Sequence, residues 1–400
     1  MGCVVIVGGE LFNKGAQAMT FTIVNELKNR FPQKEIILFS GRDYKRSQKE
    51  LSQYTFRIIK SIDLKTAFYL AGGLYRMLAK AKKSSEKETN GIKEVLKNAD
   101  FLIDISGYLL GSNWGFIRML EYIFRIKLAK HFNIAAYIMP QSFGPFDHKG
   151  IKGLIINYYI KRYLKYPKVI YAREKEGYAL LTQKYGLNNV KLSNDLVLLN
   201  RGIDINNIYS IRPDIKTLKM ISGKDNVAII PNMKNFVYGN KEEIAYLYGE
   251  IVNKLISNGK NVYLLRHAVE DIEACVAIKN KFLENEKVRL ITDEFSCIEY
   301  DQLVGQFDFL IASRFHSIVH AYKRGVPCIA IGWATKYNEL LCTFNQGKYI
   351  FDVGKNVDTN TVLQAIDDMT ENFQAESLVI KKILADIQVT NIFDVLEEHN

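Results

Sequence analysis

A short segment, Ser313–Ser317 (SRFHS), places an arginine and a histidine two residues apart directly after the apolar run Phe309–Ala312. The segment opens an amphipathic helix, and backbone N–H groups at a helix start attract anions. Arg314 adds a planar, permanently charged fork that grips carboxylate or phosphate. His316 can titrate near neutral pH and so donate a proton. The alternative is a surface arginine and a capping serine around a buried histidine. An anion-binding residue beside a proton donor at a strand end favours a catalytic role instead.

Three other strand ends carry polar residues of the same kind. His267 follows Val262–Leu265, and either orients a ligand or forms a structural hydrogen bond in a loop. Arg173 follows Val169–Ala172, and either binds an anion or begins a solvated helix. The segment Asn13–Gly15 opens the first helix of the chain without matching G-x-G-x-x-G or a Walker loop. Together these positions suit a small substrate that carries phosphate and carboxylate.

No metal site is predicted. His320 lies four residues after His316, but the glutamate of the H-E-x-x-H zinc helix is absent, so a structural or substrate-lining role is expected. The chain also lacks a D-x-D pair, the metal–diphosphate grip of many sugar-nucleotide enzymes. No Ser/His/Asp order resembles a catalytic triad.

The elements that must position these residues alternate between short apolar runs and amphipathic helices. The runs are continuously apolar, which is typical of strands buried on both faces of a parallel sheet. Such alternation predicts a doubly wound α/β fold. The expected strands are Cys3–Val7, Ile36–Phe39, Phe101–Ile105, Ile134–Met139, Val169–Ala172, Val227–Ile230, Val262–Leu265, Phe309–Ala312 and Cys328–Ile331.

A loop-like stretch over residues 200–223 interrupts the alternation, which restarts at Val227. We therefore predict a Rossmann-like domain over residues 1–205, a second over residues 206–360, and a helical tail over residues 361–400. Two such domains would face each other across a cleft. Ligands in these folds bind outside the carboxyl ends of the strands, where the polar residues cluster.

The composition is that of a folded protein: of 400 residues, 48% are hydrophobic and 24% charged, which excludes wholesale disorder. The formal net charge of +11 favours an anionic partner. The five scattered cysteines are expected to be reduced, and we expect neither a signal peptide nor a membrane span. These features predict a cytoplasmic protein.

Two segments mix basic and aromatic residues, Lys65–Lys83 and Tyr158–Tyr166. Both could rest on an anionic bilayer, which would place the protein peripherally at the inner face of the cell membrane. Ordinary helices with solvated lysine faces explain them at least as well. No nucleic-acid partner is expected, because no recognised binding motif accompanies the charge.

These residues resemble the polysaccharide pyruvyl transferase family over nearly the whole chain. Its most specific part is Ser313–Ser317, continuing to Gly325–Ile331 and Lys336. Weaker matches are Asn13–Ala16, Ser106-Gly107, Gln141–Pro145, Tyr171–Glu174, Asn194-Asp195 and Arg266-His267. The resemblance implies a fold similar to the two-lobed GT-B glycosyltransferases. It also implies transfer of the enolpyruvyl group of phosphoenolpyruvate to sugar hydroxyls, with release of phosphate and formation of a pyruvate ketal.

The resemblance implies that Arg314 and His316 hold phosphoenolpyruvate, with Arg173 reaching it from the other lobe. The chemistry agrees, because the donor needs converging cations and one general acid near neutral pKa. We therefore predict His316 as the acid, with Arg314 and Arg173 clamping the anion. The remaining predicted donor ligands are His267, Ser317 and Lys336. Predicted acceptor ligands are Asn13, Lys14, Gly15, Ser106 and Gln141, and no cofactor is expected besides the donor substrate.

The family modifies sugars of capsules, exopolysaccharides and cell walls, so the expected partners are phosphoenolpyruvate and a glycan acceptor, which can be linked to a lipid diphosphate. Two alternatives stay open. One is a GT-B-type glycosyltransferase that uses a nucleotide sugar. The other is a non-catalytic protein that binds glycans or anions.

Overall fold

A computed structural model describes most of the chain. The described residues are 2–71, 86–214, 221, 223–238, 240–332, 335–353 and 357–397. Of the basic segment Lys65–Lys83, the first part forms α3 (Leu64–Ala71), and the remainder lies outside the described residues. Within the described part of the chain, no helix is long and apolar enough to span a bilayer.

The first half of the chain forms a parallel sheet of seven strands in the order β3-β2-β1-β4-β5-β6-β7. Helices follow most of its strands and cover both faces. The strands are β1 (Cys3–Val7), β2 (Glu35–Ser40), β3 (Arg57–Lys60), β4 (Ala99–Asp104), β5 (Ala135–Gln141), β6 (Val169–Ala172) and β7 (Val190–Leu192). The helices are α1 (Lys14–Arg30), α2 (Gln48–Leu51), α3, α5 (Glu86–Lys97), α6 (Gly115–His131), α7 (Gly150–Tyr163), α8 (Lys175–Ala179), α9 (Leu196–Leu199) and α10 (Ile205–Ile208).

The second half forms a parallel sheet of six strands in the order β10-β9-β8-β11-β12-β13. Its strands are β8 (Asn226–Ile230), β9 (Asn261–Leu265), β10 (Val288–Ile291), β11 (Phe309–Ala312), β12 (Cys328–Gly332) and β13 (Ile350–Asp352). The helices are α11 (Met233–Tyr238), α12 (Lys241–Ser257), α13 (Ile272–Lys279), α14 (Cys297–Val304), α15 (Phe315–Lys323), α16 (Thr335–Thr343) and α17 (Thr359–Val389). The two sheets confirm the predicted α/β class.

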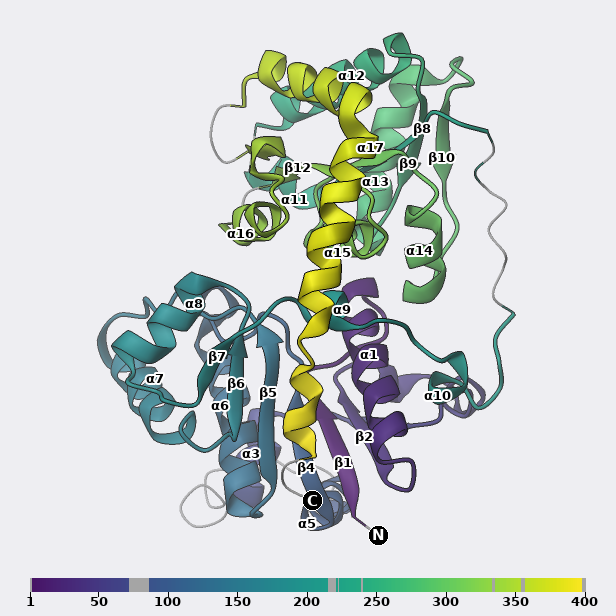
Figure 1. Cartoon of the computed structure of the whole chain (residues 1–400). Helices are drawn as coiled ribbons and strands as arrows, with labels where there is room; N and C mark the ends of the chain where they lie inside the picture. Colours follow the sequence, from purple (N-terminus) through teal and green to yellow (C-terminus); the bar gives the residue numbers. More distant parts are fainter. Residues whose placement is uncertain are drawn as a thin grey trace.

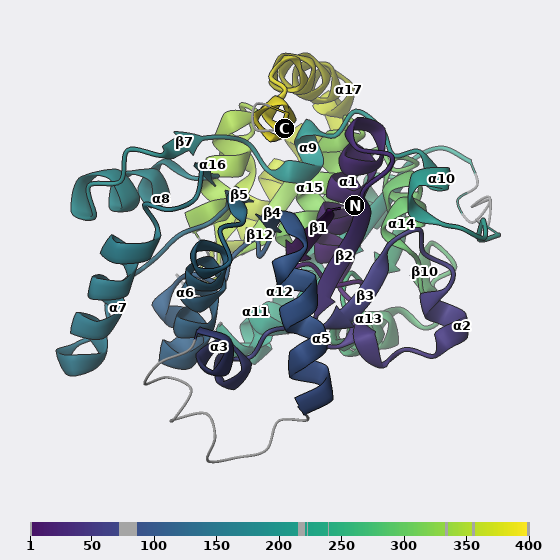
Figure 2. The same ribbon diagram turned by 90° about the horizontal axis from the view of Figure 1, so that it is seen from below.

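The central strand β1 shows why its residues are all apolar. Successive side chains of a strand point to opposite faces, and both faces of this sheet are covered. Val4 and Ile6 join the core on the α1 side, whereas Val5 and Val7 join the core under α3, α5 and α6. Seen from below, α3, α5 and α6 lie on one side of the sheet, and α1 lies on the other with the end of α17 (Figure 2).

The two sheets form separate lobes, one above the other (Figure 1). The chain passes from the first lobe to the second after α10, and α17 returns from the second lobe to the first. At its end the chain packs on the first lobe, where the Tyr171 hydroxyl donates to the carbonyl of Ile392 and Arg30 pairs with Asp394 and Glu397. The lobes are therefore joined by two crossings.

Candidate active site

Both sheets have the doubly wound strand order, in which connections run in opposite directions from a central pair of strands. These pairs are β1/β4 in the first sheet and β8/β11 in the second. A crevice opens at the carboxyl end of such a pair, and ligands bind there. In this molecule, loops after all four strands contribute to one cavity of about 460 Å³ between the lobes. Its lining consists of Asn13, Tyr108, Asn113, Trp114, Asn232, Lys234, His267, Arg314, Phe315, His316 and Tyr337.

Arg314 enters this cavity as the residue before α15, and its guanidinium is held by two carboxylates. Its Nε donates to Oδ2 of Asp271 at 2.9 Å, and its Nη2 donates to Oδ1 of Asp271 at 2.6 Å and to Oε1 of Glu270 at 2.8 Å. The Asp271 side chain is fully buried. Two-point pairing fixes the plane of the fork, so Arg314 meets a ligand in one orientation. Its positive charge is also partly compensated before any ligand arrives.

His316 lies on the first turn of α15 and contacts the first lobe on two sides. A Cβ atom built on Gly15 would lie 2.3 Å from Cγ of the His316 ring, so only glycine allows this approach of α1 to α15. On the other side, Nε2 of His316 lies 3.9 Å from Oδ2 of Asp195. When both groups are charged, they attract each other at this separation.

Asp195 is the buried partner that joins Arg173 to His316. Nη1 of Arg173 donates to Oδ2 of Asp195 at 2.5 Å, and Nη2 donates to the carbonyl of Gly107 and to Oγ of Ser142. Burial alone would raise the pKa of Asp195, but Arg173 and then His316 outweigh it, so this pKa lies below its ordinary value. The carboxylate is therefore ionised at neutral pH. Arg173 does not line the cavity; it fixes the carboxylate beside His316 instead.

His267 lines the cavity with a neutral ring. Burial, reinforced by the positive charge of Lys14, lowers the pKa of His267 well below its ordinary value. Its Nδ1 lies 3.1 Å from Oγ of Ser317, which in turn lies 2.9 Å from the hydroxyl of Tyr300. Nζ of Lys14 donates to the backbone carbonyl of His267 at 3.0 Å across the lobe boundary. Ser317 and Lys14 thus hold His267 in place and do not line the cavity.

Of the predicted acceptor residues, only Asn13 lines the cavity. Its Oδ1 caps α1 by accepting from the N–H groups of Gly15 and Ala16. Gln141 is buried, and its amide faces Asp104 and the carbonyl of Met139. The Ser106 hydroxyl accepts from Arg125 at 3.4 Å and does not line the cavity. The side chain of Lys336 lies outside the described residues.

Sequence reasoning missed a polar and aromatic wall on the first lobe. Nδ2 of Asn113 donates to the hydroxyl of Tyr108 at 2.8 Å, and the rings of Tyr108 and Trp114 meet edge to face at 6.3 Å. Trp114 is 48% exposed, which is unusual for a tryptophan unless its ring contacts a partner surface or a ligand. The signal that could have found this wall is the Asn113-Trp114 pair in the loop that follows the apolar run Phe101–Ile105.

On the second lobe, the loop after β8 supplies two further residues that the sequence analysis did not assign. Nδ2 of Asn232 donates to the carbonyl of Ser313, which ties this loop to the Arg314 loop. Lys234 adds a second lysine or arginine side chain to the lining. Among the described residues, no group of three or more His, Cys, Asp and Glu side chains could hold a metal ion.

The chain matches the polysaccharide pyruvyl transferase family over residues 13–335, and it belongs to this family. The match covers both lobes and includes the Arg314–His316 loop. A curated relative is the amylovoran biosynthesis protein AmsJ of Erwinia amylovora, 20% identical over 141 residues. That alignment spans about a third of each protein (34% of this chain and 34% of AmsJ).

Solved structures with this fold include enzymes of nucleotide-sugar chemistry. The UDP-GlcNAc 2-epimerase of Methanocaldococcus jannaschii superposes with a TM-score of 0.57 at 12% identity, covering 96% of this chain and 99% of that one. A glycosyltransferase of Rickettsia africae gives a TM-score of 0.55 at 13% identity, covering 100% and 98%. These likenesses confirm the predicted GT-B-like fold and, at such identities, nothing further.

Gly15→Ala tests the approach of the two helices. The added methyl group cannot share space with the His316 ring, so we expect the ring to turn aside or the lobes to shift apart. A crystal structure of the variant measures this directly. Gly91→Ala is the matched control, because a Cβ there meets nothing within 4 Å. An unmoved His316 ring in Gly15→Ala would show that the contact does not constrain the site.

Asp195→Asn tests the buried ion pair through its pH dependence. The folded-state pKa of Asp195 is depressed, so its ion pair with Arg173 stabilises the protein fully above about pH 4. This stabilisation is lost as the pH falls through the folded-state pKa of Asp195. Loss of one partner of a buried pair costs about 3–5 kcal/mol. We expect a lower melting temperature than wild type at pH 7 and a shrinking difference below pH 4. Asp204→Asn, at the exposed cap of α10, should show neither effect; a pH-independent deficit in Asp195→Asn would contradict the assignment.

Proposed function

We propose that this protein transfers the enolpyruvyl group of phosphoenolpyruvate to two hydroxyls of a sugar and releases phosphate. The acceptor would be a precursor of a capsular, exopolysaccharide or cell-wall glycan. Membership of the pyruvyl transferase family supports the transferase class and a role in polysaccharide biosynthesis. The observation that carries the proposal is the meeting of Arg314, His316 and Lys234 with Asn13 in one cavity between the lobes.

The second lobe would hold the donor. Phosphoenolpyruvate carries a carboxylate and a phosphate, and the cationic side chains of the cavity lie on the α11 and α15 side. Arg314 presents an oriented guanidinium, and the start of α15 adds backbone N–H groups, both of which favour an anion. The neutral ring of His267 can then serve as a hydrogen-bonding wall without adding charge.

The reaction would use His316 as the general acid. Its imidazolium gives a proton to C3 of the donor, which becomes a methyl group and leaves C2 electrophilic. One sugar hydroxyl bonds to C2 and the C2–O bond to phosphate breaks, while a second hydroxyl closes the ketal. Of the two hydroxyl protons, one replaces the proton lost by His316 and the other leaves with phosphate. Asp195 attracts the imidazolium, and Arg314 offsets the charge of the departing phosphate.

The acceptor sugar would lie against the first lobe. Tyr108 and Trp114 offer apolar ring surface, and Asn113 and Asn13 offer amide groups, which is the mixture that small polar ligands need. Such a sugar could be linked to a lipid diphosphate, and the formal net charge of +11 would favour an anionic membrane face. No cofactor beyond the donor substrate is required.

The direct test is incubation of the protein with phosphoenolpyruvate and candidate glycan acceptors. We expect phosphate release that depends on the acceptor, with a pyruvate ketal detected on the sugar by mass spectrometry. Phosphoenolpyruvate should also raise the melting temperature. Stabilisation by UDP- or GDP-sugars instead would favour a nucleotide-sugar glycosyltransferase, and binding without any phosphate release would favour a non-catalytic protein.

Two substitutions separate the proposed roles of the α15 loop. His316→Gln should lower kcat by about 10²–10⁴ with little change in donor affinity, because it removes the acid but not the anion clamp. Arg314→Lys keeps the charge but loses the fork, and should raise the KM for phosphoenolpyruvate about tenfold or more. His131→Gln, at the exposed end of α6, is the control. If His316→Gln weakened only donor binding, the acid role would be wrong.

A further inference from the structure

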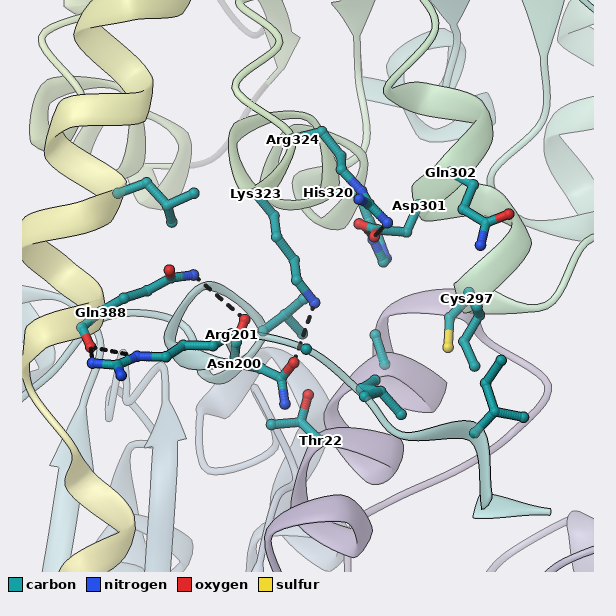
Figure 3. Close-up of a pocket in the computed structure, with 17 residues that line it drawn as sticks. Thr22, Asn200, Arg201, Cys297, Asp301, Gln302, His320, Lys323, Arg324 and Gln388 are labelled. Carbon is teal, nitrogen blue, oxygen red and sulfur yellow. Dashed lines mark hydrogen bonds and ion pairs between the residues drawn. The ribbon is translucent and has the colours of Figure 1, made fainter. Parts of the chain in front are cut away.

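A second cavity, of about 370 Å³, lies between the lobes (Figure 3). None of its lining residues lines the first cavity, at Asn13, Arg314 and His316, which we call the active-site cavity. It is lined from the first lobe by α1 and by residues 197–205, from the second lobe by α14 and α15, and from the returning crossing by α17. A ligand in this cavity would therefore contact both lobes and α17, the helix that returns from the second lobe to the first.

The segment between α9 and α10 is tied to α17 at the edge of this cavity. Nε and Nη2 of Arg201 donate to the backbone carbonyl of Gln388 at 3.1 and 2.6 Å. The amide of Gln388 donates in return to the carbonyls of Leu198 and Asn200. The cavity thus lies where the geometry of the junction between the lobes is set.

The charges of the lining are mostly positive. It contains Arg201, Lys323 and Arg324, against the single carboxylate of Asp301. The Asp301 carboxylate already has partners on both oxygens. Its Oδ2 pairs with Nη2 of Arg324 at 2.5 Å, and its Oδ1 lies 3.1 Å from Nδ1 of His320. Within the described part of the chain, the ammonium of Lys323 makes one long hydrogen bond, to Oδ1 of Asn200 at 3.5 Å. This cation lacks a close counter-ion.

Three other polar atoms of the lining are buried and have no hydrogen-bond partner among the described residues. They are Oγ1 of Thr22, Nδ2 of Asn200 and Nε2 of His320. The exposed fractions of these side chains are 0%, 1% and 2%. Figure 3 shows Lys323 extending from α15 toward Asn200, with Thr22 beside them. Buried polar atoms are almost always hydrogen-bonded, so these three atoms are suited to bind a polar ligand in the cavity.

An anion suits these groups better than water alone. The Lys323 ammonium, the Asn200 amide and the Thr22 hydroxyl can all donate to one acceptor. Burial lowers the pKa of Lys323, although Asp301 and Cys297 oppose this effect, so the cation is held at a cost that a bound anion would offset. A phosphate group offers enough oxygen acceptors for several donors at once, and the volume leaves room for a small ester substituent.

We propose that this cavity is a second anion-binding site, which takes the phosphate group of inorganic phosphate or of a small phosphomonoester at the junction of the lobes. The site does not depend on the proposed reaction. Because its ligands come from α1 and the segment after α9 on the first lobe and from α15 on the second, occupation favours the lobe arrangement in which they converge. The same two helices carry Gly15 and His316 at their first turns, so binding here also steadies the active-site cavity.

Calorimetric titration with inorganic phosphate tests the site. We expect Lys323→Gln to bind one phosphate fewer per chain than wild type, or to bind it at least about tenfold more weakly, because a charge-assisted contact is lost. Lys161→Gln, on the exposed face of α7, removes the same charge elsewhere and should bind as wild type does. Both variants keep the active-site cavity intact, so their difference reports the second cavity alone.

Two further variants distinguish a loss of phosphate binding from a folding defect in Lys323→Gln. Asn200→Asp places a carboxylate beside Lys323, so we expect a higher melting temperature without phosphate and loss of the phosphate-dependent rise that this cavity contributes. Thr22→Val removes the unpartnered hydroxyl at nearly constant volume, and should weaken phosphate binding without lowering the melting temperature of the free protein. A parallel titration with glucose 1-phosphate separates the sources: tighter binding than phosphate assigns an ester, and equal or weaker binding assigns the free ion.

Identical phosphate stoichiometry and affinity in wild type, Lys323→Gln and Asn200→Asp would overturn the proposal. The outcome is separate from that of the proposed reaction, because it is measured by phosphate binding without phosphoenolpyruvate or a glycan. A protein that fails to form a ketal can still bind phosphate at this site, and the reverse also holds.

Discussion

The contact between the His316 ring and the backbone of Gly15 is the constraint on which the rest of the arrangement depends. It brings the first turn of α15 against the first turn of α1, where any larger residue than glycine would keep them apart. Each helix follows a strand at the switch point of its sheet. The contact therefore makes the crevice at the end of β1 and β4 face the crevice at the end of β8 and β11. Arg314, Asn13 and His267 then share a single cavity although they come from different strands.

The same pair of helices links the two cavities. From their first turns at the active-site cavity, α1 and α15 run toward the junction, where Thr22 and Lys323 line the second cavity. Gln17 lies between, and its Oε1 accepts from the backbone N–H of Cys297 across the lobe boundary at 2.7 Å. A shift of one lobe would change both cavities together, because packed helices move as rigid elements. The fold therefore couples the shape of the cavity at Arg314 and His316 to the shape of the second cavity.

The sequence was enough to predict the central strands and not the edge strands. Each of the nine predicted apolar runs overlaps one strand of the structure, whereas β3, β7, β10 and β13 were missed, and these four are the edges of the two sheets. An edge strand is covered less completely, so a segment such as Arg57–Lys60 keeps charged residues at both ends and loses the apolar signal. Missing the four edge strands did not hide the alternation of strands and helices, so the predicted α/β fold class was still correct.

At the site, the sequence indicated which strand ends matter but not which way each side chain turns. Arg314 and His316 were predicted from their spacing and do line the cavity. Their partners Asp271 and Asp195 were not assigned, because pairing between loops of different strands leaves no local pattern. Gln141 sits at a strand end as expected, but its side chain faces the core.

The most direct test is a crystal structure of the protein soaked with phosphoenolpyruvate. We expect the donor in the cavity that Arg314 and His316 line, with its anionic groups at Arg314 and the start of α15 and with C3 facing His316. Donor density that lies away from the Arg314–His316 loop, while this cavity stays empty, would contradict it.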